Sequence, residues 1–251
     1  MVRGLELFRD HFKNFTANYV LIGGTACAQA FERAGLEFRG TKDLDIVLCV
    51  ESLDAKFIVH FWNFIKAGNY AIQQKSSGRK IFYRFTKPAR EDFPFMLELF
   101  SGKPETFVLP DESRIIPIPA DEDISSLSAI LLDENYYRFI QASKVIRDDL
   151  TLIPAESLIV LKSKAWLDLS LRKEKGEAGD SQNIKKHIND IFRLYRVVSF
   201  VRPVSVAASI KNELREIFGR MQSEKINLKA LGIAGKTSRE IIDELTRLYE
   251  L

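Results

Sequence analysis

The chain has little of the chemistry that cysteine and histidine provide. Its 251 residues include two cysteines and three histidines. Cys27 and Cys49 stand in apolar surroundings, and neither has a CxxC or Cys/His pattern around it. We therefore expect neither a zinc site nor a disulfide framework, but two reduced core cysteines of the kind found in cytosolic proteins. The histidines, at His11, His60 and His187, show no spacing typical of metal ligands.

Long apolar runs are also lacking. No stretch approaches the ~20 apolar residues of a membrane-spanning helix. Residues 1–15 mix charged with apolar side chains and contain no continuous apolar segment, so we do not expect a signal peptide. No internal repeat and no long low-complexity segment is present. The sequence thus predicts a cytoplasmic protein with no membrane partner.

A strong charge of either sign is missing as well. The 37 basic and 34 acidic residues leave a formal net charge of only +3. This balance neither demands nor excludes a nucleic-acid partner, so any basic surface must be local. The contents of hydrophobic residues (46%) and charged residues (28%) are those of an ordinary globular protein. The length allows one large domain or two modest ones.

The pattern of apolar residues changes at Pro154. Before it, helical spacing over residues 5–15, 25–34 and 53–67 alternates with short extended runs. Predicted strands lie at 19–22, 43–50, 80–85, 93–100, 114–119 and 125–132, with a last pair formed by 136–141 and 144–153. After Pro154 the spacing is helical to the C-terminus. We expect an α+β fold, in which a mixed sheet with flanking helices (1–150) precedes a helical domain (151–251).

Two carboxylates stand at the start of an apolar strand. In TKDLDIVLCV (41–50), alternation puts Asp43 and Asp45 on one face of the strand, where their charges repel and are costly to bury. Glu98 is the only charge within the apolar segment FMLELF. Three carboxylates on neighbouring strands suit one or two Mg²⁺ ions, ~4 Å apart if both bind, because a cation removes the repulsion. The alternative to a metal site is that Asp43 and Asp45 lie at a solvated entrance to their strand. Glu98 would then lie on an edge strand and face water.

A glycine-rich turn precedes this strand in the sequence. Gly23, Gly24 and Thr25 lie between the strand at 19–22 and an alanine-rich helix that we expect to begin at Thr25. Glycines let the backbone approach an anion closely, and the start of a helix offers unpaired N–H groups. The segment therefore predicts a phosphate cradle, to which Thr25 adds a hydroxyl. A plain structural turn is the alternative reading.

These segments together carry a family resemblance. YVLIGGTACAQAF, TKDLDIVL and FMLELF resemble the DNA polymerase β-type nucleotidyltransferase superfamily, and within it the AbiEii-type branch of abortive-infection and toxin–antitoxin systems. The resemblance implies a nucleotidyltransferase-fold sheet and a helical domain that closes the nucleotide cleft. It also implies that Lys162, in a Lys-x-x-Ala motif, binds the triphosphate and that Asp190 is a further catalytic acid. Where the branch has Asp-x-x-Asp, this chain has His187 before Asp190.

The sequence thus favours an Mg²⁺-dependent nucleotidyltransferase. Its substrate would be an NTP, and the resemblance implies an acceptor RNA such as tRNA, or a protein hydroxyl, with a cognate antitoxin as a further partner. The alternative is a nucleotide-binding or antitoxin-like module without catalysis on the same fold. Lys162 and Asp190 also have ordinary readings as solvated helix residues. The basic residues within 172–186 form either a solvated tip or a patch for an RNA backbone.

Overall fold

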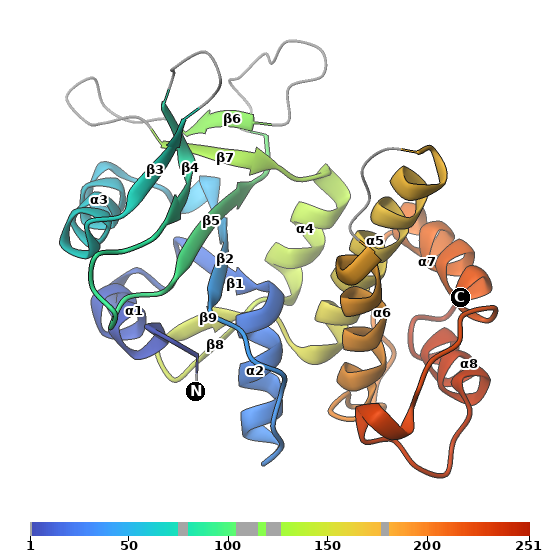
Figure 1. Ribbon diagram of the computed structural model, residues 1–251. Helices are drawn as coiled ribbons and strands as arrows, with labels where there is room; N and C mark the ends of the chain where they lie inside the picture. The colour runs from blue at the N-terminus through green and yellow to red at the C-terminus, as the bar shows by residue number, and fades with distance from the viewer. Residues whose placement is uncertain (1, 75–79, 104–114, 119–126, 177–180) are drawn as a thin grey trace. The chain divides into compact units, whose positions relative to one another are not determined.

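The computed structural model describes residues 2–74, 80–103, 115–118, 127–176 and 181–251 (Figure 1). The chain divides into two compact units. Unit 1 comprises Met1–Glu32 and Glu37–Ile153, and unit 2 comprises Arg33–Leu36 and Pro154–Leu251.

Unit 1 is built on one mixed sheet. The described strands pair in the order β3-β4-β5-β2-β1-β9-β8, while β7 pairs with β5 and with β6. Strand β2 runs antiparallel to β1 but parallel to β5, so the sheet is mixed and the predicted α+β class is confirmed. Its elements are α1 (Leu5–Phe12), η1 (Lys13–Phe15), β1 (Tyr19–Ile22), α2 (Gly23–Arg33), β2 (Asp43–Leu48), η2 (Val50–Ser52), α3 (Ala55–Gly68), β3 (Ala71–Gln74), β4 (Lys80–Thr86), β5 (Met96–Ser101), β6 (Ile115–Ile118), β7 (Leu127–Leu131), α4 (Glu134–Ser143), β8 (Val145–Arg147) and β9 (Leu150–Leu152).

An aromatic core covers one face of this sheet. Tyr19 on β1 and Phe85 on β4 share that face by register and are both fully buried. Phe8 of α1 packs edge-on against Tyr19 at 5.2 Å between ring centroids. Phe61 and Trp62 of α3 pack against Phe85, each at 5.8 Å. Helices α1 and α3 therefore cover this face, and the residues that alternate with it point to the opposite one.

The prediction of a strand at residues 136–141 is wrong, because this segment lies in helix α4. The Asp133 carboxylate caps the helix by accepting hydrogen bonds from the backbone N–H groups of Asn135 and Tyr136. Tyr136, Phe139 and Ile140 are buried at helical spacing. The aromatic residues favour a strand by composition, but the cap and the spacing decide for a helix. Strand β8 pairs with β9 instead.

The two cysteines are core residues, as expected. Cys27 and Cys49 are buried and form no disulfide. Burial also raises the pKa of the Cys49 thiol, although Gln141 and Lys144 donate hydrogen bonds to its sulfur. Cys49 is therefore protonated at neutral pH and a poor nucleophile.

Unit 2 is helical. It contains α5 (Ala155–Glu174), α6 (Ser181–Tyr195), α7 (Ala208–Met221), the short η3 (Lys229–Leu231) and α8 (Ser238–Leu248). Pro154 stands at the N-cap of α5, where its missing N–H is not needed. Thr237 and Glu240 form a capping box at the start of α8. Among the described residues, no helix combines the length and the apolar character needed to cross a membrane.

Candidate functional site

The sheet register brings the three predicted carboxylates to one face. In the parallel pair of β2 and β5, Asp45 lies opposite Glu98, and Asp43 lies two residues before Asp45. Partners in register project to the same side, as do residues two apart on one strand. All three side chains thus lie on the face opposite to α1 and α3. Strand β5 is flanked by β2 and β4, so Glu98 is not on an exposed edge.

The glycine turn contacts the second of these acids. Helix α2 begins at Gly23, whose φ of 66° is in the left-handed region that favours glycine. A Cβ placed on Gly23 would lie 1.7 Å from Oδ2 of Asp45. No residue with a side chain fits this turn while the carboxylate keeps its position. Gly23 therefore determines where the Asp45 carboxylate can lie.

Two further contacts hold the turn against the start of β2. The hydroxyl of Thr25 donates a hydrogen bond to the backbone carbonyl of Asp43 at 2.8 Å, and Thr25 is fully buried. A Cβ on Gly24 would lie 2.4 Å from Oγ1 of Thr41. The helix starts two residues earlier than expected, so Thr25 positions the strand and does not cap the helix. Phosphate binding by Gly23, Gly24 and Thr25 stays a prediction.

Glu98 has a cationic partner that was not predicted from the sequence. Arg84 lies opposite Glu98 on β4, and its Nε donates a hydrogen bond to Oε1 at 2.7 Å. Nη2 of Arg84 bonds to the same oxygen. Glu98 is only 9% exposed, so an arginine at this position offsets the cost of burying the charge. The predicted pairing of residues 80–85 with 93–100 was the signal that would have found it.

The first acid lacks such a partner. Oδ1 of Asp43 is buried, and no described residue gives it a hydrogen bond. A buried carboxylate oxygen without a donor is costly, which makes it a candidate for a cation or an ordered water. Across the described ranges, no cluster of three or more histidine, cysteine or acidic side chains is assembled that could hold a metal ion. The three-carboxylate magnesium set therefore stays a prediction.

Lys162 and Asp190 form an ion pair within unit 2. Nζ of Lys162 on α5 lies 3.4 Å from Oδ2 of Asp190 on α6, and their side chains are 7% and 0% exposed. Arg193, one turn further along α6, places Nη1 at 3.2 Å from Oδ1 of Asp190. Neither residue is a solvated helix residue. Their predicted roles toward a nucleotide stay predictions.

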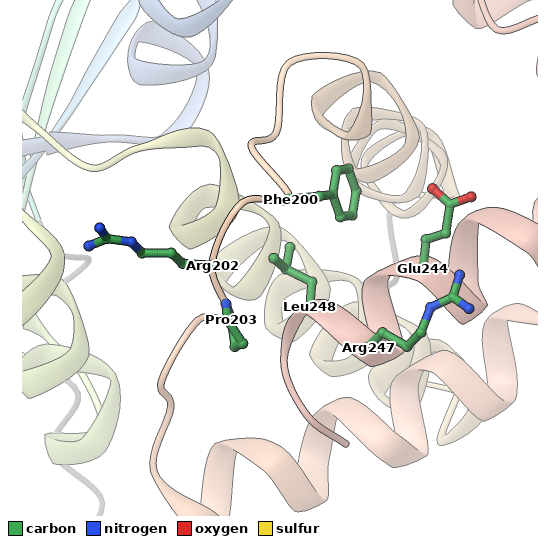
Figure 2. A pocket seen from close by; sticks show the side chains of 6 residues that line it. All are labelled: Phe200, Arg202, Pro203, Glu244, Arg247 and Leu248. Carbon is green, nitrogen blue, oxygen red and sulfur yellow. The ribbon is translucent and has the colours of Figure 1, made fainter.

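Unit 2 also contains a pocket of about 340 Å³ (Figure 2). Glu244, Arg247 and Leu248 come from α8, and Arg202 extends away from the other side chains. Glu244 already accepts hydrogen bonds from Lys236 and Tyr195, each at 2.5 Å, which hold the pKa of its carboxyl below the ordinary value. The pocket is lined by Phe200, Arg202, Pro203, Glu244, Arg247 and Leu248, none of which is a predicted site residue.

Comparison with known proteins finds similarity to solved structures. No protein-family model matches the chain, and no curated protein matches it. The chain is similar to an antigenic nucleotidyltransferase-like protein from Paracoccidioides brasiliensis, with 13% identity and a TM-score of 0.43 over 94% of this chain and 97% of that one. It is also similar to a candidate nucleotidyltransferase from H. pylori, with 11% identity and a TM-score of 0.32 over 98% of this chain and 91% of that one. Since both TM-scores lie below 0.5, the functional proposal depends on the chain's own residues.

Proposed function

We propose that this protein is an Mg²⁺-dependent nucleotidyltransferase, of the AbiEii-type branch, that moves a nucleoside monophosphate from an NTP to an acceptor hydroxyl. The observation that supports this most directly is the shared face of Asp43, Asp45 and Glu98, with the turn at Gly23 directly against the Asp45 carboxylate. A buried aspartate oxygen without a donor is the second support. A sheet stabilised by packing alone has no use for this arrangement.

The acids have the chemistry that magnesium requires. Asp43 and Asp45, joined by Glu98, would hold the ion through carboxylate oxygens, and the unsatisfied Oδ1 of Asp43 fits this role. When bound, Mg²⁺ supplies positive charge against the triphosphate. Both hydrogen bonds from Arg84 go to Oε1 of Glu98, so Glu98 would join through Oε2 or by exchanging these bonds for the ion.

The remaining roles belong to the turn and the acceptor. The N–H groups at the start of α2, around Gly24, would bind phosphate oxygens at the positive end of the helix. The acceptor hydroxyl would attack the α-phosphorus in line and release pyrophosphate, while Asp45 or Glu98 receives its proton. Lys162 would neutralise the outer phosphates, with Asp190 holding its ammonium group. The acceptor would be an RNA such as tRNA, or a protein, in a toxin-type role with a cognate antitoxin.

A second candidate is a nucleotide-binding or antitoxin-like module without catalysis. The Arg84–Glu98 pair favours it, because the guanidinium offsets the charge of the carboxylate and so weakens it as a metal ligand and as a base. In that case the protein would bind a nucleotide and transfer nothing.

One experiment separates these functions. The purified protein is titrated with each NTP with and without Mg²⁺, and then incubated with labelled NTP and total cell RNA or protein. Asp45→Asn keeps the size of the side chain and removes its charge, and should abolish both binding and transfer. Asp10→Asn, at an exposed position on α1, is the control. Binding without transfer supports the second candidate, and no Mg²⁺-dependent binding by the folded wild-type protein rejects both.

A further inference from the structure

A second pocket in unit 2 has a different character from the pocket in Figure 2. Its volume is about 420 Å³, within the range of ~300–1,000 Å³ typical of small-molecule sites. It is lined by residues of α5, α6 and η3 and by residues 224–227. None of the residues predicted to hold the metal or the triphosphate lines it, but Lys173 and Lys185 belong to the basic residues within 172–186 for which an RNA patch is one reading.

The lining of this pocket is strongly basic. Among the described lining residues, four side chains are basic and one is acidic: Lys173, Lys185, Arg193 and Lys225 against Glu224. Arg193 is bound to Asp190, but the three lysines form no ion pair with any residue in the described ranges. Cations grouped in a concave surface raise the local concentration of anions. The pocket is therefore suited to a negatively charged ligand.

Trp166, one of the lining residues, also carries a buried hydrogen-bond donor. It is 2% exposed, and its indole N–H is buried with no acceptor among the described residues. A buried tryptophan N–H normally has a partner, so an acceptor that reached this donor would remove the cost of leaving it unpaired. Ile188 and Leu231, both buried, form an apolar wall in the same pocket. The ligand should therefore combine an anionic group, an apolar ring and a hydrogen-bond acceptor.

We infer that this pocket binds a nucleotide. The phosphate would lie among Lys173, Lys185 and Lys225, also near Ser181 in the first turn of α6, where backbone N–H groups are unpaired within the helix. The base would lie on the apolar wall and offer an acceptor to the N–H of Trp166. Both a free mononucleotide and one residue of an RNA strand have this chemistry, and the test distinguishes them.

The chain offers a direct optical test, because it contains only two tryptophans. Trp62→Phe leaves Trp166 as the single fluorescent reporter, and Asp45→Asn with EDTA in the buffer removes the proposed site of unit 1. This protein is titrated with AMP, with a six-nucleotide single-stranded RNA and with inorganic phosphate. We expect a saturable change in Trp166 emission with AMP or with the RNA, at least about tenfold tighter than with phosphate, because the base adds contacts.

Charge-reversal variants test the location. Lys185→Glu with Lys225→Glu should weaken binding about tenfold or more, since two attractions become repulsions. The control Arg239→Glu changes an exposed cation of α8 outside the pocket and should leave binding unchanged. Trp166→Phe keeps the ring and loses the donor, and should weaken AMP binding several-fold in calorimetry. Circular dichroism confirms that each variant is folded.

The outcomes are distinct. AMP bound as tightly as the RNA assigns a free nucleotide, and RNA bound far more tightly, with a steep dependence on salt, assigns a strand. The inference is overturned if neither ligand gives a saturable change, if phosphate binds as tightly as AMP, or if the double charge reversal has no effect. None of these results depends on transferase activity, so failure here leaves the proposed function untouched.

Discussion

Replacing Gly23 by alanine tests whether the turn positions the Asp45 carboxylate. The chain contains a matched control, because Gly23 and Gly35 have the same φ of 66°. Around Gly35 a Cβ would meet no atom within 4 Å, whereas at Gly23 it would lie 1.7 Å from Oδ2 of Asp45. Gly35→Ala therefore has only the backbone cost, and Gly23→Ala adds the contact with the acid.

The structure sets the size of both effects. A left-handed conformation costs an alanine about 1–2 kcal/mol, which Gly35→Ala should lose in its free energy of unfolding. At Gly23, contacts under 3.0 Å are essentially never adopted by a Cβ, so Oδ2 must retreat from 1.7 Å by more than 1 Å. A misplacement of about 1 Å near the reacting groups can reduce a rate about 10²-fold.

The assay measures unfolding in urea together with Mg²⁺-dependent NTP binding and nucleotide transfer. We expect Gly35→Ala to retain binding and transfer despite its lower stability. Gly23→Ala should lose at least as much stability, and its transfer rate should fall about 10²-fold. A folded Gly23→Ala protein with the wild-type rate would refute the role of this turn.

Three further predictions concern buried charges. Lys162→Met should destabilise the protein in urea unfolding, by less than the about 3–5 kcal/mol of a fully uncompensated buried charge, because Arg193 still bonds Asp190. Lys162→Met with Asp190→Leu should recover part of this loss. A fully stable single variant contradicts the pairing. Mg²⁺ should raise the melting temperature of Arg84→Gln more than that of the wild type, because the ion would replace the cation lost beside Glu98. Equal shifts in melting temperature argue against a metal at Glu98. Burial lowers the pKa of His11, which stacks at 3.9 Å on His60. Below pH ~6.5 the unfolded chain therefore binds more protons, so melting temperature should fall between pH 7 and pH 5, less steeply in His11→Gln.

Local patterns predicted the strands of the site because strand geometry is local. The two-residue period of a strand places Asp43 and Asp45 on the same face, and the segment Asp43-Leu44-Asp45 is enough to predict this. The position of Glu98 directly opposite Asp45 depends on the parallel register of β2 and β5, which are joined by a connection of 47 residues. Such a pairing is not encoded in either strand alone, and the sequence singled out Glu98 only as the one charge within an apolar segment.

Two other segments differ from a prediction by composition, one through a local cap and one through a contact distant in sequence. The segment at 136–141 has the aromatic content of a strand, yet the Asp133 cap and its buried helical face make it a helix. Lys162 looked like one of several exposed lysines of α5, but Asp190 on α6 lies opposite and buries it. A cap is readable from sequence once it is looked for. A buried ion pair between two helices cannot be predicted in this way, because the sequence of α5 does not indicate which residue of α6 Lys162 contacts.

Glu98 and Asp43, on the same face of the sheet, differ in how their buried oxygens are satisfied. Each carboxylate near the centre of a sheet needs a donor or a cation, and Glu98 has one in Arg84, held by two hydrogen bonds to Oε1. Asp43 has no such donor for Oδ1, although Thr25 a short distance away donates to its backbone carbonyl instead. A protein stabilised only for folding would satisfy both acids, because an unsatisfied buried oxygen costs about 1–3 kcal/mol. The unsatisfied oxygen belongs to the acid that shares a face with Asp45, so the cost falls where the proposed cation would compensate for it.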